Sequence, residues 1–327
     1  MAERFLVTGA LGCIGAWTVK RLVAEGVPVW TYDLPGEPRR LRLIMDDAAL
    51  GKVHFVSGDI TDPAAFDRVV AENGITHIIH LAALQVPFVK ANPIQGARVN
   101  VVGTTVVFEA ARHHAAQVQG LVYASSVGVY GGPELYPDGT LHHDSPVHPL
   151  NLYGVFKFAN EGTARIYHQD WGVNSLGIRP YVLYGPGRDQ GMTSTPTKAM
   201  LAAAAGRPYH ISYGGSVVFQ YADDCARAFI QAARTGAKGS AVYNLGGTES
   251  AIADVVRDIT RAAPASAGSI TFNPAALALP PHVDGAPLEQ AIGRLHWTPL
   301  AAGIDETIHI FRAAIAAGKI DVAAILA

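Results

Sequence analysis

The chain has 327 residues, of which 49% are hydrophobic, and a formal net charge of −2 at pH 7. This apolar content supports a sizeable core and argues against disorder, and the lack of a basic cluster interleaved with aromatic residues argues against a nucleic acid partner. The only two cysteines, Cys13 and Cys225, predict no structural disulfide and fit a reducing, cytoplasmic setting. We expect no membrane partner, since no apolar run reaches the roughly 18 residues that cross a bilayer and the first residues lack the plan of a secretory signal.

Short runs rich in Val, Ile and Leu alternate with helical stretches along the first half of the chain. The predicted strands cover residues 4–8, 28–32, 53–57, 77–81, 119–124 and 175–179. Long helices are predicted over 96–116 and 151–171, and their exposed faces suggest the seam of a homodimer. Such alternation predicts an α/β fold with a doubly wound parallel sheet of the Rossmann type.

The second half of the chain is less regular and richer in Pro and Gly. Helices are predicted over 194–205, 220–233 and 303–317, and residues 241–247 resemble one more strand of the main sheet. We therefore expect a dinucleotide-binding domain of residues 1–179 with 217–247. A smaller, interleaved substrate-binding lobe would comprise residues 180–216 with 248–327.

A glycine-rich loop follows the first predicted strand, with Gly9, Gly12 and Gly15 spaced by three and a helix-like stretch after them. Glycine lets the backbone turn tightly and approach a pyrophosphate, whose charge then lies at the helix amino terminus. The loop, including Cys13 and Ile14, is therefore predicted to bind a dinucleotide.

The second predicted strand ends in a carboxylate, Asp33, about twenty residues after the glycine-rich loop. A carboxylate at this position binds ribose hydroxyls and repels a 2′-phosphate, which predicts NAD as the cofactor. Arg39 and Arg40 nearby leave NADP as the alternative.

The segment Tyr153-Gly-Val-Phe-Lys157 places a phenol and an ammonium one helical turn apart on the same face. A free phenol titrates near pH 10, and a nearby cation is expected to lower its pKa toward the neutral range. The pair therefore predicts a general base, Tyr153, assisted by Lys157.

Together these segments resemble the extended branch of the short-chain dehydrogenase/reductase superfamily, the NAD-dependent epimerase/dehydratase family, over nearly the whole chain. The resemblance implies that Ser126, Tyr153 and Lys157 form the catalytic trio, with Lys157 also holding the cofactor ribose. Since side chains alternate along a strand end, only one of Ser125 and Ser126 should face the cofactor, and the spacing to Tyr130 favours Ser126.

The same resemblance implies further cofactor contacts, some of them from residues far from the glycine loop. They come from Asp59 and Ile60 beside the adenine ring, Leu81, Ala82 and Ala83 at a strand end, Asn100 on a helix, Pro180 and Tyr181 after a strand, and Tyr153 and Lys157 themselves. His80, in an apolar strand, is expected to be a hydrogen-bonded core residue and not a catalyst.

Two departures from the nucleotide-sugar members of that family point to a different substrate. Val127 and Gly128 stand where the dehydratases carry an Asp-Glu pair, and neither can exchange a proton. Pro180 to Leu183 stand where the epimerases usually place an asparagine that grips the diphosphate. We expect instead a small polyhydroxylated or acidic substrate that contacts Gln85, Ser125, Ser126, Arg188 and Thr193. The alternative for the loop of residues 185–195 is a surface turn with a solvated Arg188.

The sequence therefore predicts an NAD-dependent oxidoreductase that transfers a hydride between NAD and a secondary alcohol of a sugar, sugar acid or similar polyol. One alternative is an epimerase, acting on a sugar or nucleotide sugar, that returns the hydride to a transient ketone. Another is a non-catalytic NAD-binding protein, against which the intact trio argues. The adjacent histidine pairs at 113–114 and 142–143 lack the spacing of metal ligands, so no metal is expected.

Overall fold

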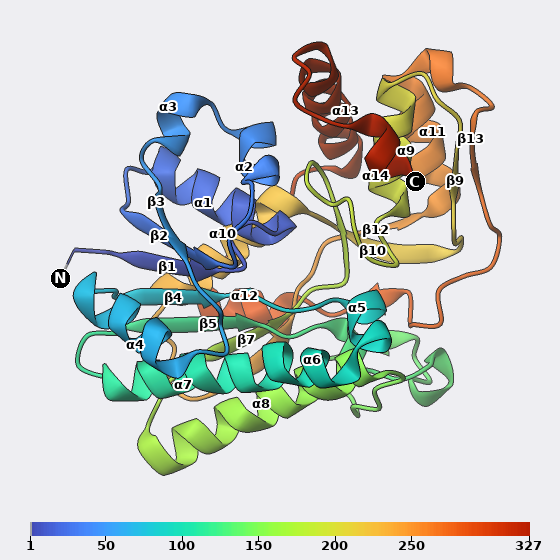
Figure 1. The fold of residues 1–327 in the computed structure, drawn as a ribbon. Helices are drawn as coiled ribbons and strands as arrows, with labels where there is room; N and C mark the ends of the chain where they lie inside the picture. Colours follow the sequence, from blue (N-terminus) through green and yellow to red (C-terminus); the bar gives the residue numbers. More distant parts are fainter. Residues whose placement is uncertain (1) are drawn as a thin grey trace.

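The computed structural model describes residues 2–327, whose centre is a seven-stranded parallel sheet (Figure 1). Its strands are β1 (Phe5–Thr8), β2 (Val29–Asp33), β3 (His54–Ser57), β4 (His77–His80), β5 (Gly120–Ala124), β7 (Leu176–Arg179) and β11 (Val242–Asn244). They lie in the order β11-β7-β5-β4-β1-β2-β3. The order reverses between β1 and β4, and ligands of open α/β sheets bind at the carboxyl ends of the strands beside such a reversal.

Helices cover both faces of this sheet, which is why its central strands are buried along their whole length. Helices α1 (Cys13–Ala24) and α10 (Ala222–Arg234) cover one face, and α4 (Pro63–Glu72), α7 (Gly103–His113) and α8 (Leu152–Trp171) cover the other (Figure 1). All four residues of β1 and of β4 are buried, whereas the edge strand β3 is largely exposed. The predicted doubly wound sheet is confirmed, with strand ends within about a residue of the prediction.

The helix predicted over residues 96–116 is divided into three consecutive segments. They are α6 (Pro93–Ala97), a π-helical turn (Arg98–Val102) and α7. Asn92 caps the first segment by accepting a hydrogen bond of 3.1 Å from the backbone nitrogen of Gln95. π-turns inside helices are rare overall, and those that occur often lie at functional sites. This one carries Asn100.

A smaller lobe is built from the later part of the chain around a three-stranded sheet, and four helices pack in it (Figure 1). The sheet has the order β12 (Thr248–Ala251), β10 (Ser216–Tyr221) and β8 (Val182–Tyr184). Two further parallel pairs are β9 (Tyr209–Ile211) with β13 (Ile270–Phe272), and β6 (Thr140–Leu141) with β14 (His282–Val283). The four helices are α9 (Thr195–Ala204), α11 (Ile252–Ala262), α13 (Leu300–Ala316) and α14 (Val322–Leu326).

The remaining short helices connect these elements. They are α2 (Arg39–Ile44), α3 (Asp47–Leu50), α5 (Val86–Ala91) and α12 (Ala286–Ile292), with 3₁₀ turns at Val127–Val129, Pro133–Leu135 and Pro264–Ser266. Within residues 2–327, no helix is both long enough and apolar enough to span a bilayer. Cys13 and Cys225 are both unpaired, as expected.

The two lobes interleave along the chain. The strand expected over residues 241–247 is present as β11, which pairs with β7 in the main sheet. Strand β10, which we did not predict, belongs to the smaller sheet although the expected boundary placed most of it with the dinucleotide-binding domain. The division into two domains therefore stays a prediction.

Candidate active site

The three glycines between β1 and α1 form a tight cradle that other residues would fill. Gly9 has a φ of 67°, and a Cβ atom there would lie 2.6 Å from the backbone nitrogen of Ala82. A Cβ atom on Gly15 would overlap the carbonyl oxygen of Gly9. No side chain caps the first turn of α1 at Gly12, so its amide groups are available to an anion. The cradle fits the pyrophosphate of a dinucleotide.

Cys13 and Ile14, the other predicted residues of this loop, begin helix α1. The Cys13 Sγ atom lies 4.0 Å from the carbonyl oxygen of Pro186. Burial raises the pKa of this thiol to about 11, so the neutral thiol persists at neutral pH. Trp17, one turn on, donates from Nε1 to the same carbonyl over 2.9 Å. Helix α1 therefore holds the loop of residues 185–195.

Asp33 ties the end of β2 to the glycine loop. Its Oδ2 atom accepts hydrogen bonds from the backbone nitrogens of Ala10 (2.8 Å) and Leu11 (3.3 Å). Burial raises the pKa of this carboxyl to about 7, although the amides of Leu11 and Ala10 act in the opposite direction. Among the described residues Oδ1 has no hydrogen-bond partner, so it can accept a ribose hydroxyl.

Arg40, one of the two arginines that left NADP as the alternative cofactor, forms an ion pair and a hydrogen bond within the protein. Its Nη2 atom bonds Asp189 Oδ1 over 2.6 Å, and its Nη1 atom donates to the carbonyl oxygen of Leu11 over 2.9 Å. Arg40 therefore links the cofactor loop to the loop of residues 185–195 and is not free for a 2′-phosphate. Arg39 is exposed.

Helix α8 brings Tyr153 and Lys157 to the carboxyl end of β5. Asn151 caps the helix by accepting a hydrogen bond of 3.1 Å from the backbone nitrogen of Gly154, which places Tyr153 in the first turn. The Lys157 Nζ atom lies 5.7 Å from the centroid of the Tyr153 ring and donates to the carbonyl oxygen of Ala124 over 2.6 Å. The phenol and the ammonium thus share one face of the helix, as the spacing predicted.

Ser126 meets Tyr153 at the same place. A Cβ atom on Gly128 would lie 3.3 Å from Ser126 Oγ and 3.5 Å from Tyr153 Cε1, so both side chains border one spot beside this glycine. Ser126 Oγ accepts a hydrogen bond of 3.0 Å from the backbone nitrogen of Gly128. The trio inferred from the sequence is therefore assembled around the end of β5.

The pKa of Tyr153 differs from the expectation of a lowered value. Burial raises it above the ordinary value of a phenol, and a hydrogen bond with Ser126 and the charge of Arg188 only partly oppose this. Burial also lowers the pKa of Lys157 to about 8, against the nearby Glu161 carboxylate. The reason for the difference is that desolvation of the phenolate outweighs the nearby positive charge in the protein alone.

Ser125 does not face the same spot, which corrects the expectation that it contacts the substrate. Its side chain is buried, and Oγ donates a hydrogen bond of 2.5 Å to Oε1 of Glu161. Successive side chains of an extended segment point in opposite directions, so only Ser126 borders Tyr153.

Behind Lys157 lies a buried ion pair that the sequence analysis missed. Arg179 bonds Glu161 through Nε–Oε1 (2.8 Å) and Nη2–Oε2 (2.7 Å), and both side chains are 6% exposed. Arg179 Nη1 also donates to the Tyr130 hydroxyl (2.5 Å). The available signal was the spacing of Tyr153, Lys157 and Glu161, which repeats every four residues and so continues one helical face.

Asn100 positions the segment that follows β4. Its Oδ1 atom accepts from the backbone nitrogen of Leu84 (2.7 Å) and its Nδ2 atom donates to the carbonyl oxygen of Leu84 (2.9 Å). The predicted cofactor contacts Leu81, Ala82 and Ala83 lie in this segment, next to Gly9. Asn100 is 1% exposed, so it organises the loop from within the protein.

His80 is a core residue, as expected. Its ring nitrogens bond the hydroxyls of Thr8 (2.7 Å) and Thr104 (3.0 Å), and burial lowers its pKa to about 3. The imidazole therefore stays neutral and joins β1, β4 and α7.

The other predicted cofactor residues lie at the carboxyl edge of the sheet, where Asp59 is exposed and Ile60, Pro180 and Tyr181 are buried. The Asp59 carboxylate bonds the backbone nitrogen and hydroxyl of Thr61, both over 2.9 Å. Ile60 is buried against Gly103. Pro180 and Tyr181 are also buried where the chain passes from β7 to β8, and the Tyr181 hydroxyl donates to the carbonyl oxygen of Pro280 over 3.0 Å.

The predicted substrate residues Gln85, Arg188 and Thr193 lie together. Arg188 Nη2 donates to Thr193 Oγ1 over 3.1 Å. A side chain on Gly191 would overlap Gln85 Oε1 and lie 3.2 Å from Arg188 Nη2. Tyr213, which the sequence analysis missed, lies beside the same loop, because the backbone nitrogen of its neighbour Ser212 donates to Thr195 Oγ1 over 3.4 Å. A tyrosine between two short strands gave no signal that could have identified it.

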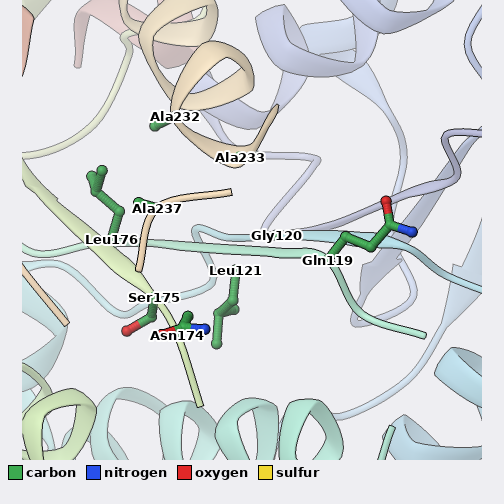
Figure 2. A pocket seen from close by; sticks show the side chains of 9 residues that line it. All are labelled: Gln119, Gly120, Leu121, Asn174, Ser175, Leu176, Ala232, Ala233 and Ala237. Atoms are coloured by element: carbon green, nitrogen blue, oxygen red, sulfur yellow. The ribbon is translucent and has the colours of Figure 1, made fainter. Parts of the chain in front are cut away.

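One small cavity lies away from this site, at the amino ends of β5 and β7 (Figure 2). It is bordered by Gly120, Leu176 and Ala233, and its volume of about 10 Å³ has room for no more than a water molecule. Among residues 2–327, no group of three or more His, Cys, Asp or Glu side chains could hold a metal ion.

Comparisons with known proteins show which family the chain resembles. A family model described as the NAD dependent epimerase/dehydratase family matches residues 5–246. The UDP-glucose 4-epimerase of Mycolicibacterium smegmatis is 34% identical over 320 residues, which cover 94% of this chain and 98% of that protein.

Solved structures of known enzymes have a similar fold. The UDP-glucose 4-epimerase of Thermus thermophilus in complex with NAD superposes with a TM-score of 0.78 at 25% identity, covering 95% of this chain and 100% of that one. A partial-consensus L-threonine 3-dehydrogenase has a TM-score of 0.82 at 23% identity, again covering 95% and 100%, and this likeness concerns the fold alone.

Proposed function

This chain belongs to the NAD-dependent epimerase/dehydratase family and is an enzyme with NAD as its cofactor, and on this premise we propose that it oxidises a secondary alcohol of a sugar, sugar acid or similar polyol. The single observation that carries the proposal is the meeting of Ser126, Tyr153 and Lys157 at the carboxyl end of β5, next to the glycine cradle. That edge of a doubly wound sheet is where cofactor and substrate meet.

The chain's own residues account for cofactor binding in this proposal. The amides of the glycine loop bind the pyrophosphate, and Asp33 accepts the ribose hydroxyls through its free oxygen. Lys157 binds the hydroxyls of the other ribose of NAD, the one attached to the nicotinamide. When bound, NAD supplies the acceptor for the hydride that leaves the carbinol carbon.

The proton of the substrate hydroxyl goes to Tyr153. Ser126 donates a hydrogen bond to the substrate oxygen while it changes from alcohol to carbonyl, and Lys157 stabilises the phenolate that does the work of a base. The raised pKa of Tyr153 means that most molecules carry a neutral phenol at neutral pH, so the oxidation should be faster in alkaline solution.

An epimerase is the second candidate, and the 34% identity to the mycobacterial UDP-glucose 4-epimerase supports it. The same trio would form a transient ketone and return the hydride to its opposite face. Against it stands the segment Pro180 to Leu183, where a buried Tyr181 bonded to Pro280 replaces the amide expected for gripping a diphosphate.

One incubation separates the candidates. Purified protein is mixed with NAD and a panel of sugars, sugar acids and UDP-sugars, and both NADH and sugar isomers are measured. Net NADH formation supports the dehydrogenase, and isomers without NADH support the epimerase. Neither signal from any carbohydrate would contradict the proposed substrate class.

We also propose a homodimer formed through α6, the π-turn and α8. Six large apolar side chains are exposed on these contacting helices, namely Ile94, Val102, Leu152, Val155, Phe158 and Trp171. Exposed apolar groups that gather on neighbouring helices favour a protein interface. Light scattering on the wild type and on Phe158→Asp tests this, since the variant should be monomeric. The expected cytoplasmic location stays a prediction.

A further inference from the structure

Arg188 is a partly buried cation without a carboxylate partner. The only hydrogen bond of its side chain within residues 2–327 runs from Nη2 to Thr193 Oγ1, and its buried Nε atom has no partner. A buried guanidinium normally pairs with an anion, because leaving its donors unsatisfied is costly. Arg188 is therefore arranged to meet an anion that the protein does not supply.

Two neutral polar groups beside Arg188 are also unsatisfied. Gln85 Oε1 and the hydroxyl of Tyr213 are both buried without a hydrogen-bond partner. Together with Arg188, these residues come from three separate parts of the chain. Gln85 follows β4, Arg188 follows β8, and Tyr213 lies between β9 and β10. Of the ten buried side-chain polar atoms without a partner among residues 2–327, these three gather beside the loop of residues 185–195, which marks a site that a ligand completes.

This group lies next to the reacting centre. Gln85 immediately precedes α5, which contacts α8, the helix that carries Tyr153. The charge of Arg188 also opposes the rise that burial causes in the pKa of Tyr153 and of Tyr213. Gly191 has a φ of 95°, and its missing side chain leaves room between Gln85 and Arg188. A small ligand on Arg188 would therefore present its neighbouring carbons to Tyr153.

The nearest acidic residue does not neutralise Arg188. Asp189 instead pairs with Arg40, whose guanidinium also donates to the glycine loop at Leu11. The site thus keeps one uncompensated positive charge, which matches one carboxylate better than a doubly charged diphosphate or a neutral polyol.

We propose that Arg188, with Gln85 and Tyr213, forms the recognition site for the carboxylate of a small hydroxy acid, and that this acid is the substrate that Tyr153 oxidises. The guanidinium binds the carboxylate through its free donors. Gln85 accepts a hydrogen bond from a substrate hydroxyl, and Tyr213 bonds a second oxygen. The inference rests on the proposed oxidation and adds the chemical class of the substrate.

Binding is measured by calorimetry on the NAD-loaded protein with a panel of four- to six-carbon aldonates. Each acid is compared with the neutral polyol of the same carbon chain, and UDP-glucose is included. The proteins are the wild type, Arg188→Gln, Arg188→Lys and a matched control, Arg207→Gln, which removes an exposed arginine of the same lobe. Circular dichroism and NAD affinity confirm that each variant is folded.

We expect at least one acid to bind more tightly than its neutral counterpart, and Arg188→Gln to weaken that binding about 10- to 100-fold. Arg188→Lys should recover part of the loss, because it restores the charge but not the planar fork. Arg207→Gln should match the wild type. Binding of the polyols or of UDP-glucose in preference to every acid, or acid binding unaffected by Arg188→Gln, would overturn the inference.

The variant Tyr153→Phe separates this inference from the proposed oxidation. It should bind the acid as the wild type does while forming NADH at least about 100-fold more slowly, because it lacks only the proton acceptor. Acid binding without turnover in the wild type would contradict the oxidation and leave the recognition site standing. Turnover of neutral polyols but of no acid would support the oxidation and contradict the recognition site.

Discussion

The cofactor side and the substrate side of this site satisfy their polar groups in opposite ways. On the cofactor side, Asp33 bonds the glycine loop, His80 bonds two threonines, and Asn100 bonds the backbone of Leu84 with both ends of its amide. On the substrate side, Gln85 and Arg188 retain buried polar atoms without partners. The first arrangement is rigid before any ligand arrives, whereas the second requires a ligand to complete it.

The sharpest way to break the cofactor side is to fill its cradle. Gly15→Ala places a methyl group onto the carbonyl oxygen of Gly9, so the loop must open. NAD affinity should fall by about 100-fold or more, since the amides no longer converge on the pyrophosphate.

The matched control is Gly162→Ala on α8, where an added Cβ atom meets nothing within 4 Å. Fluorescence titration with NAD compares the two variants. Equal NAD affinity in both would contradict the cradle.

The buried pair behind the site should matter for stability. Glu161→Gln leaves the Arg179 guanidinium buried without its carboxylate, which should lower the free energy of unfolding by about 3 kcal/mol. Urea denaturation measures the change. The exposed pair of Arg42 with Glu37 is the control, and Glu37→Gln should cost less than about 1 kcal/mol. Similar losses in both variants would show that burial of the pair is not what stabilises it.

The pH profile of kcat/KM sharpens the view of the catalytic pair. Burial raises the pKa of Tyr153 and lowers that of Lys157 to about 8. Below about pH 8, Lys157 is mostly protonated and the fraction of Tyr153 present as phenolate grows about tenfold per pH unit. The value of kcat/KM should therefore rise about tenfold per pH unit in this range. Above about pH 8 the loss of the Lys157 proton cancels that gain, and the profile should level.

Lys157→Arg tests the origin of this bend, because a guanidinium keeps its charge throughout. Its profile should be lower but should continue to rise past pH 8. A wild-type rate that is flat from about pH 6 to about pH 8 would be inconsistent with a phenolate base.

What the sequence could reveal depended on whether the feature was local. The glycine loop, Asp33 and the pair of Tyr153 and Lys157 are set by spacing along a strand, turn or helix, so periodicity was enough to find them. The family resemblance added Ser126, and the alternation along an extended segment explained why only one serine borders Tyr153.

Features that depend on tertiary packing were not accessible in this way. The role of Glu161 depends on its ion pair with Arg179 on the neighbouring strand β7. The role of Tyr213 depends on its position near Arg188 in the loop that follows β8. The expected lowering of the Tyr153 pKa was wrong because the sequence shows a nearby cation but not the desolvation that outweighs it.

The most direct test of the central claim is the activity of Tyr153→Phe measured beside its NAD affinity. The account predicts that NADH formation falls by about 100- to 10,000-fold while NAD binds as in the wild type, because the variant loses only the group that takes the proton. Turnover within a few fold of the wild type would contradict the claim that the Tyr153 hydroxyl is the base.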